Sequence, residues 1–283
     1  MDLVLNSKFF EQLSAAELGE KVGAMGYDGI DICVRPGHPV NLDNVERALP
    51  AAHRIWRDQG LYCPLATAPV DFNDPSAAAA ERLYAGCAEA GVGHIKLGYW
   101  RFREGDDYWR ELDRARRGLE EFAALSARYG VKTCYHTHSG SCIGSNCAGI
   151  MHLVRGMDPQ LVGIYPDFGH MALDGEDLAM GLAMIRDYLA LAGIKDSFHA
   201  PQPEGSEPPY APMFTTLGGG SVNWRKVLEL LAAMDYSGPL VVHTEYKFGE
   251  DIIRQVGYAD EKPASLESLV RQDAAYLRAL LAA

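Results

Sequence analysis

Residues 129–140 read YGVKTCYHTHSG, and this short stretch contains every part of the unit that decides the fold. Gly130 ends a helical pattern, at the position where a left-handed residue closes a helix. A strand-like run follows from Val131 and ends in the polar sequence HTHSG, which begins at His136. The order of helix, glycine, strand and polar strand end predicts one βα repeat.

The same unit recurs along the whole chain. Strand-like runs recur about every 34 residues, which suits a βα unit of roughly 30 residues or more, and they begin near Leu3, Tyr27, Leu61, Val92, Val131, Val162, Leu191 and Pro239. Five glycines each end a helical pattern directly before a strand: Gly26, Gly60, Gly91, Gly130 and Gly238. Eight such units without antiparallel hairpin signals predict one (β/α)8 TIM barrel over residues 1–283. A doubly wound sheet is the alternative, but no G-x-G-x-x-G follows the first strand.

Two helical patterns near the end of the chain are well marked. Asn223 is a predicted N-cap, and the helix after it would bury Trp224, Val227, Leu228, Leu231 and Met234. The last pattern, at three-and-four spacing, places on one face Leu266, Leu269, Val270, Leu277, Leu280 and Leu281.

Two segments depart from the short connections expected of a barrel. Residues 200–222 are rich in Pro and Gly and too long for a plain connection. On the C-terminal rim such a loop is a candidate lid, with a variable surface insertion as the alternative. The second segment is 248–262, after the eighth strand.

Composition narrows the class of protein. The formal charge is −12, from 38 acidic and 26 basic residues, and no Lys/Arg-rich stretch is present. A nucleic-acid partner is therefore not expected, because it would need a basic surface. No run approaches the roughly 20 apolar residues of a membrane helix, so no membrane partner is expected either.

The cysteines and the first residues bear on location. Six cysteines are scattered, and three of them, Cys33, Cys63 and Cys134, fall in apolar runs where buried free thiols are usual. The beginning, MDLVLNSKFFEQL, has no basic region followed by a small-residue cleavage site. These features predict a reducing, cytoplasmic setting.

Ionisable residues gather where the predicted strands end, which is the active-site face of such barrels. His136 and His138 are two residues apart, so they share one face of the fifth strand. Two histidines at one strand end favour a metal or acid–base site over a satisfied core histidine.

The next three strands end similarly. Asp167 stands at the tip of the sixth strand and His170 follows, both possible metal ligands, although Asp167 could simply cap the next turn. The seventh strand ends in Lys195-Asp196, and His199 follows shortly after. Lys195 is either a functional lysine or, together with Asp196, only surface charge. The eighth ends in VVHTEYK, with Glu245 and His243 on a shared face.

Other rim positions have less specific signals. Asp31, Lys96 and Arg101 are candidate substrate contacts, with capping or pairing as equally good structural roles. Four aromatic residues could line an apolar wall for a sugar, though core packing is commoner: Tyr99, Trp100, Phe102 and Tyr108.

These motifs, taken in order, resemble the sugar phosphate isomerase/epimerase family of xylose isomerase-like barrels, which includes tagatose epimerases, hydroxypyruvate isomerases and inosose dehydratases. The resemblance runs through six motifs over nearly the whole chain: GYDGIDI, YHTHSG, PDFGH, IKD, LGGGSVNW and HTEY. It implies a TIM barrel that acts on a small-molecule carbohydrate, and a homo-oligomer is compatible with it.

The resemblance also implies one divalent metal ion, with Mn first and Mg, Co or Zn as alternatives. Asp167 and Glu245 match the family's aspartate and final glutamate ligands, and His136 stands in the place of the first glutamate. The family's seventh-strand histidine is replaced by Gly193. His199 is the predicted replacement, and His138 or His170 are the alternatives.

The chemistry implied is removal of a proton next to a carbonyl, giving an enediolate. The predicted catalytic residues are Glu245, His138, Lys195 and His170, with His136 as another candidate base. A sugar isomerase or epimerase is the first prediction. A keto-sugar dehydratase or lyase is the alternative, because family epimerases use two glutamates where this chain keeps one, and H-x-H-x-G is similar to inosose dehydratases. An apurinic-site endonuclease and a non-catalytic sugar-binding barrel are less favoured.

Overall fold

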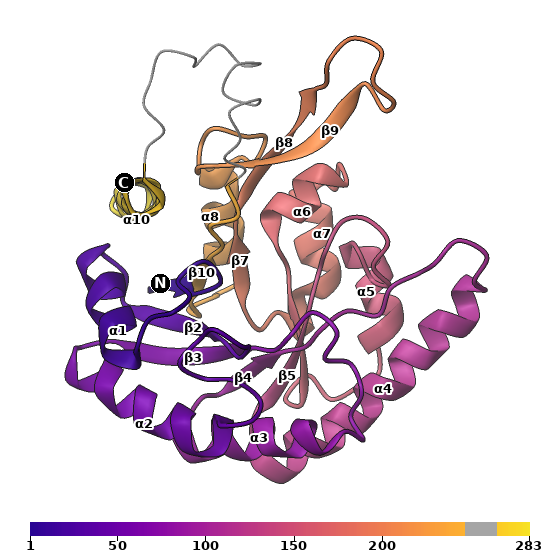
Figure 1. Ribbon diagram of the computed structural model, residues 1–283. Helices are drawn as coiled ribbons and strands as arrows, with labels where there is room; N and C mark the ends of the chain where they lie inside the picture. Colours follow the sequence, from indigo (N-terminus) through magenta and orange to yellow (C-terminus); the bar gives the residue numbers. More distant parts are fainter. Residues whose placement is uncertain (247–264) are drawn as a thin grey trace.

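Eight parallel strands form one sheet in the computed structural model, in the order β6-β5-β4-β3-β2-β1-β10-β7 (Figure 1). Their bounds are β1 Leu3–Asn6, β2 Gly29–Cys33, β3 Tyr62–Thr67, β4 His94–Lys96, β5 Lys132–His136, β6 Val162–Tyr165, β7 Ala192–Ile194 and β10 Leu240–Val242. Two isolated parallel bridges, Ile164 to Leu189 and Asp167 to Gly193, connect the outer strands β6 and β7. The sheet is thus nearly closed, and the predicted (β/α)8 barrel is confirmed.

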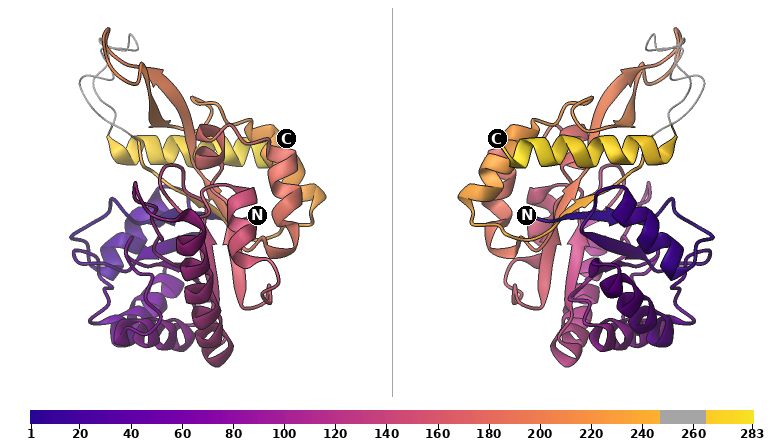
Figure 2. Two further views of the ribbon diagram at one scale, coloured as in Figure 1. Left: turned by 90° about the vertical axis from the view of Figure 1, so that its right-hand side faces the viewer. Right: turned by 90° about the vertical axis from the view of Figure 1, so that its left-hand side faces the viewer.

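The structure describes residues 1–246 and 265–283. The predicted second loop, 248–262, therefore lies outside the described residues. Helices connect the strands and cover the sheet from outside (Figures 1 and 2). Their bounds are α1 Ala15–Ala24, α2 Val45–Asp58, α3 Ala78–Ala90, α4 Tyr108–Tyr129, α5 Cys147–Val154, α6 Phe168–Leu173, α7 Leu178–Ile185, the 3-10 turn η1 Arg186–Tyr188, α8 Trp224–Ala233 and α10 Leu266–Leu281.

The residues that the sequence predicts at helix ends take up these roles in the structure, with one exception. Asn223 caps α8 by accepting a hydrogen bond from the Lys226 amide, as predicted. Four of the five predicted glycines have positive φ: Gly26, Gly60, Gly91 and Gly130. Gly238 does not, because the left-handed residue after α8 is Asp235, with φ 56°. Helix α8 ends at Ala233, so the chain turns before it reaches Gly238.

The segment 200–222 is not one long loop. Strands β8, Asp196–Pro201, and β9, Tyr210–Thr215, pair antiparallel to form a hairpin that projects from the barrel (Figure 2). This corrects the sequence expectation, which found no antiparallel hairpin. Proline-rich composition suggested a loop, but prolines are tolerated in a two-stranded ribbon because both strands have a free edge. Pro212 lies opposite His199 in this ladder.

The interior of the barrel has an apolar floor below a polar layer. The floor contains side chains from several strands: Val4, Leu65, Cys134, Tyr165, Leu191 and Val241. A larger apolar core fills the space between sheet and helices. All six cysteines are buried and free, as the sequence predicted for three of them. In the described part of the chain, no helix has the length and apolar character needed to cross a membrane.

Candidate active site

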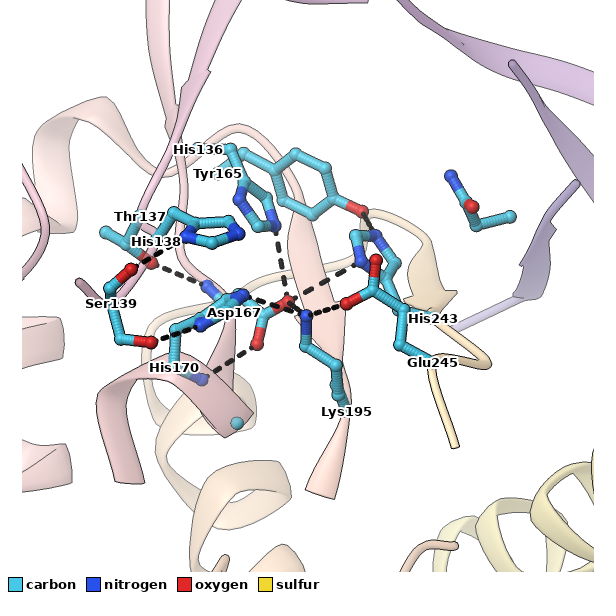
Figure 3. A network of polar contacts seen from close by, with 12 residues as sticks. His136, Thr137, His138, Ser139, Tyr165, Asp167, His170, Lys195, His243 and Glu245 are labelled. Carbon is cyan, nitrogen blue, oxygen red and sulfur yellow. Dashed lines mark hydrogen bonds and ion pairs between the residues drawn. The ribbon is translucent and has the colours of Figure 1, made fainter. Parts of the chain in front are cut away.

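Asp167 is the centre of a buried polar cluster at the C-terminal ends of the strands (Figure 3). It caps α6, because its Oδ1 accepts a hydrogen bond from the His170 amide at 3.0 Å. Its Oδ2 lies 3.3 Å from His136 Nε2 and 3.5 Å from His243 Nδ1. The capping role and the site role therefore coexist, each using one carboxylate oxygen.

Three groups in this cluster could hold a metal ion. One ligand atom each from His136, Asp167 and His243 lies within 4.8 Å of the others. His136 Nε2 and Asp167 Oδ2 are buried atoms with no hydrogen-bond partner in residues 1–246 and 265–283, a costly state unless something else binds them. Two imidazole nitrogens and one carboxylate oxygen form a donor set suited to borderline divalent ions. The residues present therefore fit a divalent ion.

The other ring nitrogens of the two histidines contact tyrosine hydroxyls. His136 Nδ1 lies 3.0 Å from the Tyr99 hydroxyl, and His243 Nε2 lies 2.7 Å from the Tyr165 hydroxyl. Such partners orient metal-binding imidazoles. Burial lowers the pKa of His136 well below its usual value and that of His243 to about 4. Both rings are therefore neutral near pH 7, with a lone pair available to a metal.

Lys195 connects this cluster to Glu245. Its Nζ lies 2.9 Å from Glu245 Oε2 and 3.3 Å from Asp167 Oδ2, and its side chain is 2% exposed. Burial alone would lower the pKa of Lys195, but Asp167 and Glu245 outweigh it and raise the pKa. Lys195 is therefore an ammonium that can donate hydrogen bonds. Glu245 also pairs with Lys8, and the two lysines outweigh burial and hold the Glu245 pKa well below normal.

His138 and His170 lie side by side, with ring centroids 4.0 Å apart. His138 Nδ1 lies 2.8 Å from the Ser139 carbonyl, which only accepts, so Nδ1 carries the proton and Nε2 a lone pair. The Lys195 ammonium donates to His170 Nε2 at 2.9 Å, so His170 Nδ1–H donates to Ser139 Oγ. Burial lowers the pKa of both rings, that of His138 to about 4. His170 thus positions Lys195, while His138 offers a basic nitrogen.

The structure brings most of the predicted site residues together, but not His199. His199 is exposed on β8 and is not part of the three-residue donor cluster. His243 takes the third position instead. It was recognisable as a neighbour of Glu245 in HTEY, but strand alternation could not show that His243, rather than Glu245, faces Asp167. Glu245 is not in the donor cluster either, because its carboxylate contacts Lys8 and Lys195.

Strands β1 to β4 contribute a second polar group. Asn6 Nδ2 and Thr67 Oγ1 both donate to Asp31 Oδ2, at 2.6 and 3.0 Å. Asp31 is fully buried, and burial raises its pKa to about 6. Burial, and then repulsion from Arg35, lowers the pKa of Lys96 to about 7.

A cavity of about 210 Å³ separates this second group from the histidine side of the barrel mouth. Of the rim positions that the sequence suggested, Lys96, Arg101 and Tyr99 line the cavity. Trp100 instead packs in the core at 3% exposure.

Asp196 anchors the backbone that follows Lys195 in the chain. Its carboxylate accepts hydrogen bonds from four donors, all between 2.9 and 3.1 Å: the amides of Ser197, Gly218 and Val222 and the Trp224 indole. A Cβ at Gly220 would lie 2.2 Å from Asp196 Oδ1. The glycines of LGGGSVNW therefore allow the backbone to wrap around a buried carboxylate, a role that the sequence did not reveal.

Comparison with known proteins agrees with this architecture. Residues 20–280 match the family model described as xylose isomerase-like TIM barrel. The chain belongs to this family. An inosose dehydratase of Lactiplantibacillus plantarum is 31% identical over 144 residues, 48% of this chain and 47% of that protein. An inosose dehydratase of Halalkalibacterium halodurans is 30% identical over 135 residues, 45% of this chain and 44% of that protein. The chain thus spans about half the length of these curated relatives in the matched regions.

Solved structures share the fold at low identity. A 3-keto-D-glucoside 4-epimerase of E. coli superimposes with a TM-score of 0.71 at 18% identity, over 99% of both chains. A xylose isomerase-like TIM barrel protein of Mycobacterium smegmatis, solved in complex with magnesium, gives 0.70 at 15% identity over 99% of this chain and 96% of that one. Two of these proteins are named inosose dehydratases and one is named an epimerase, and the solved structures show that the chain shares their fold.

Proposed function

We propose that the protein is a metal-dependent isomerase or epimerase of a sugar or keto-sugar. The observation that carries the proposal is the pair of orphaned ligand atoms, His136 Nε2 and Asp167 Oδ2, beside the Lys195–Glu245 ion pair. A cation site and a proton-transfer pair within one barrel mouth support chemistry at a carbon next to a carbonyl.

His136, Asp167 and His243 would hold the ion. We keep Mn as the first metal because the family resemblance implies it, with Mg, Co or Zn as alternatives. Bound there, the ion would supply Lewis-acid polarisation of a substrate carbonyl. Glu245 is the proposed base, because its carboxylate is ionised and lines the cavity. Lys195, held protonated, would donate a hydrogen bond to the developing oxyanion.

His138 is the second basic group at the cavity. Its Nε2 carries the ring's lone pair, and its ring lines the same space as Glu245. An epimerase needs proton transfer on both faces of a carbon, and His138 and Glu245 come from different strands of the barrel mouth. We therefore assign His138 as the partner of Glu245 in proton transfer.

A keto-sugar dehydratase is the second candidate. The relatives at about 30% identity carry the name inosose dehydratase, and the donor cluster contains histidine where family epimerases have a first glutamate. The first step, α-proton removal, is the same. In a dehydratase the protonated Lys195 would assist departure of the β-hydroxyl.

One experiment tests both candidates. The purified protein is analysed for metal, then incubated with D-fructose and with an inosose in deuterated water after loading with Mn. Deuterium on the α-carbon of unchanged sugar supports an isomerase or epimerase, and loss of water with near-ultraviolet absorption supports the dehydratase. Absence of both metal binding and exchange would reject the proposal. Glu20→Gln, an exposed position on α1, is the control for Glu245→Gln.

The remaining expectations belong to the same proposal. We infer a single domain over residues 1–283, a cytoplasmic location and a small-molecule carbohydrate as partner. The β8–β9 hairpin, in place of the loop 200–222, is the candidate lid. Support comes from Phe214 of β9, whose ring lies 4.5 Å from Lys195 Nζ and 5.4 Å from the His170 ring.

A further inference from the structure

The cavity in the barrel mouth has more cationic than anionic side chains around it. Five cationic residues line it: Lys8, Arg35, Lys96, Arg101 and Lys195. Glu245 is the carboxylate on its wall. Asp167 contacts Lys195, and Asp31 is bonded to two wall residues. This local excess is opposite in sign to the net charge of −12 of the whole chain.

Three of the cations are compensated by nearby carboxylates. Lys8 and Lys195 pair with Glu245 and Asp167. Lys96 and Asp31 each favour the charged form of the other. Arg35 and Arg101 remain, and neither forms an ion pair within residues 1–246 and 265–283.

Of these two arginines, Arg35 gives the stronger indication of an anion site. It follows β2, and its Nε is buried with no hydrogen-bond acceptor among the described residues. A guanidinium always carries its charge, and leaving a buried N–H unsatisfied is energetically costly. Its repulsion also disfavours the charged form of Lys96. Arg35 lines the cavity, so an anion there would pair with its guanidinium group and offset this repulsion.

We propose that the substrate carries an anionic group, a carboxylate or a phosphate, which Arg35 binds with help from Lys96 and Arg101. The inference rests on the proposed function, and it specifies the substrate as a sugar acid or a sugar phosphate. Guanidinium groups bind both anions with paired, charge-assisted hydrogen bonds.

The arrangement of the cavity sets the orientation of this substrate. His136, His138, Lys195, His243 and Glu245 line one side, and the residues from β1 to β4 and their loops line the other. The cavity volume of about 210 Å³ corresponds to the volume of roughly seven water molecules. One small molecule can therefore extend from one side of the cavity to the other. The reacting carbonyl then faces the histidine side while the anion lies at Arg35.

Arg101 lies nearer to solvent than Arg35. It is exposed, and it also lines an adjacent cavity of about 550 Å³ that shares Val70 and Tyr99 with the first. This position suits attraction of an anion on its way into the barrel mouth. Arg35 is therefore the residue whose replacement tests binding in the cavity itself.

The test measures binding by titration calorimetry with Mn-loaded protein and three matched ligands: D-fructose, D-fructuronate and D-fructose 6-phosphate. At least one anionic ligand should bind about tenfold or more tightly than D-fructose. The preferred one identifies the anion as carboxylate or phosphate. Raising the salt concentration should weaken binding of the anionic ligand and leave that of D-fructose nearly unchanged.

Arg35→Gln should bring the affinity for the anionic ligand close to that for D-fructose, with the affinity for D-fructose changed less than about twofold. Arg54→Gln, at an exposed arginine of α2, is the matched control and should keep the preference. Equal affinities for all three ligands in the wild type, or binding of neither anionic ligand, would overturn the inference. An equal loss of affinity for all three ligands in Arg35→Gln would overturn it as well.

Failure of this inference and failure of the proposed function are separable. The anion preference is read from binding alone, whereas the reaction is read from metal content and from deuterium exchange, measured also with D-fructuronate and D-fructose 6-phosphate. A protein that exchanges deuterium but shows no anion preference loses only the inference. A protein that prefers anions but never exchanges the α-proton loses only the reaction.

Discussion

The two halves of the barrel mouth differ in how their polar atoms are satisfied. Around β5, β6, β7 and β10, Asp167 Oδ2 meets two imidazoles and Lys195 at 3.3 to 3.5 Å without a proper hydrogen bond. Around β1 to β3, Asp31 Oδ2 accepts two good hydrogen bonds, from Asn6 and Thr67. The first half leaves a carboxylate oxygen and an imidazole nitrogen without a hydrogen-bond partner among the described residues, as a cation site would. The second half satisfies Asp31 Oδ2, but Asp31 Oδ1 and the Nε–H of Arg35 have no partner among those residues.

The largest effect should come from removing the carboxylate at the centre of the first half. Asp167→Asn should abolish stoichiometric metal binding and lower turnover by about a thousandfold or more, because it removes the anionic ligand. Asp31→Asn, the counterpart in the other half, should retain the metal. Elemental analysis of both proteins decides this.

A control is needed because Asp167 also stabilises the buried Lys195 charge. His243→Gln removes a neutral ligand, so it should lose metal with a smaller change in melting temperature. If Asp31→Asn loses metal as fully as Asp167→Asn, the contrast between the two halves is wrong.

The next effect concerns Glu245. Replacing it by Gln keeps its volume but removes the basic group, and turnover should fall at least about a hundredfold. The fold should persist, because the side chain lies at the barrel mouth and is 21% exposed. Deuterium incorporation should fall in parallel with turnover. Near-normal turnover in this variant would remove Glu245 from the proposed chemistry.

A smaller effect is expected for the hairpin. Replacing residues 202–209 by a two-residue turn shortens the projecting end and keeps Phe214 beside Lys195. KM should rise several-fold, while the melting temperature should change by only a few degrees if the hairpin is a lid. A large fall in melting temperature with unchanged KM would indicate that the hairpin is structural.

The smallest expected effect is on the free energy of unfolding, and it comes from Asp31 in the β1–β3 half of the barrel mouth. The folded-state pKa of Asp31 is raised to about 6 by burial, above its value in the unfolded chain. The folded protein therefore holds the Asp31 proton more tightly, and this contribution to stability is lost as pH rises from about 4 to about 6. The slope is at most about 1.4 kcal/mol per pH unit.

The test is urea unfolding across that pH range with wild-type protein and Asp31→Asn. The difference in unfolding free energy between the two should move in favour of the variant as pH rises. A difference that stays constant between pH 4 and 7 would show that Asp31 titrates normally.

Sequence patterns predicted the barrel because each βα unit carries its own local signals. The run before His136, the cap at Asn223 and the glycine at position 130 act over a few residues, so their effect can be read directly. The polar strand ends were predicted for the same reason, since all strands of a parallel barrel point to one rim.

Distances across the rim were not predictable from these local signals. His199 and His243 were both near strand ends, and only the closed sheet shows that His243 lies beside Asp167 while His199 is exposed on the hairpin. The tautomer of His170, set by Lys195, likewise depends on a contact between different strands. Long-range contacts of this kind leave no periodic pattern in the sequence.

The wrapping of the backbone around Asp196 has a practical meaning for protein engineering. Four hydrogen bonds anchor residues 197–224 to one carboxylate, so Lys195 is held independently of whatever extends beyond Pro201. The segment between Pro201 and Tyr210 can thus be treated as an exchangeable cassette. Libraries that vary its length and sequence should diversify ligand selectivity without displacing Lys195, provided that Gly220 and Asp196 are left untouched.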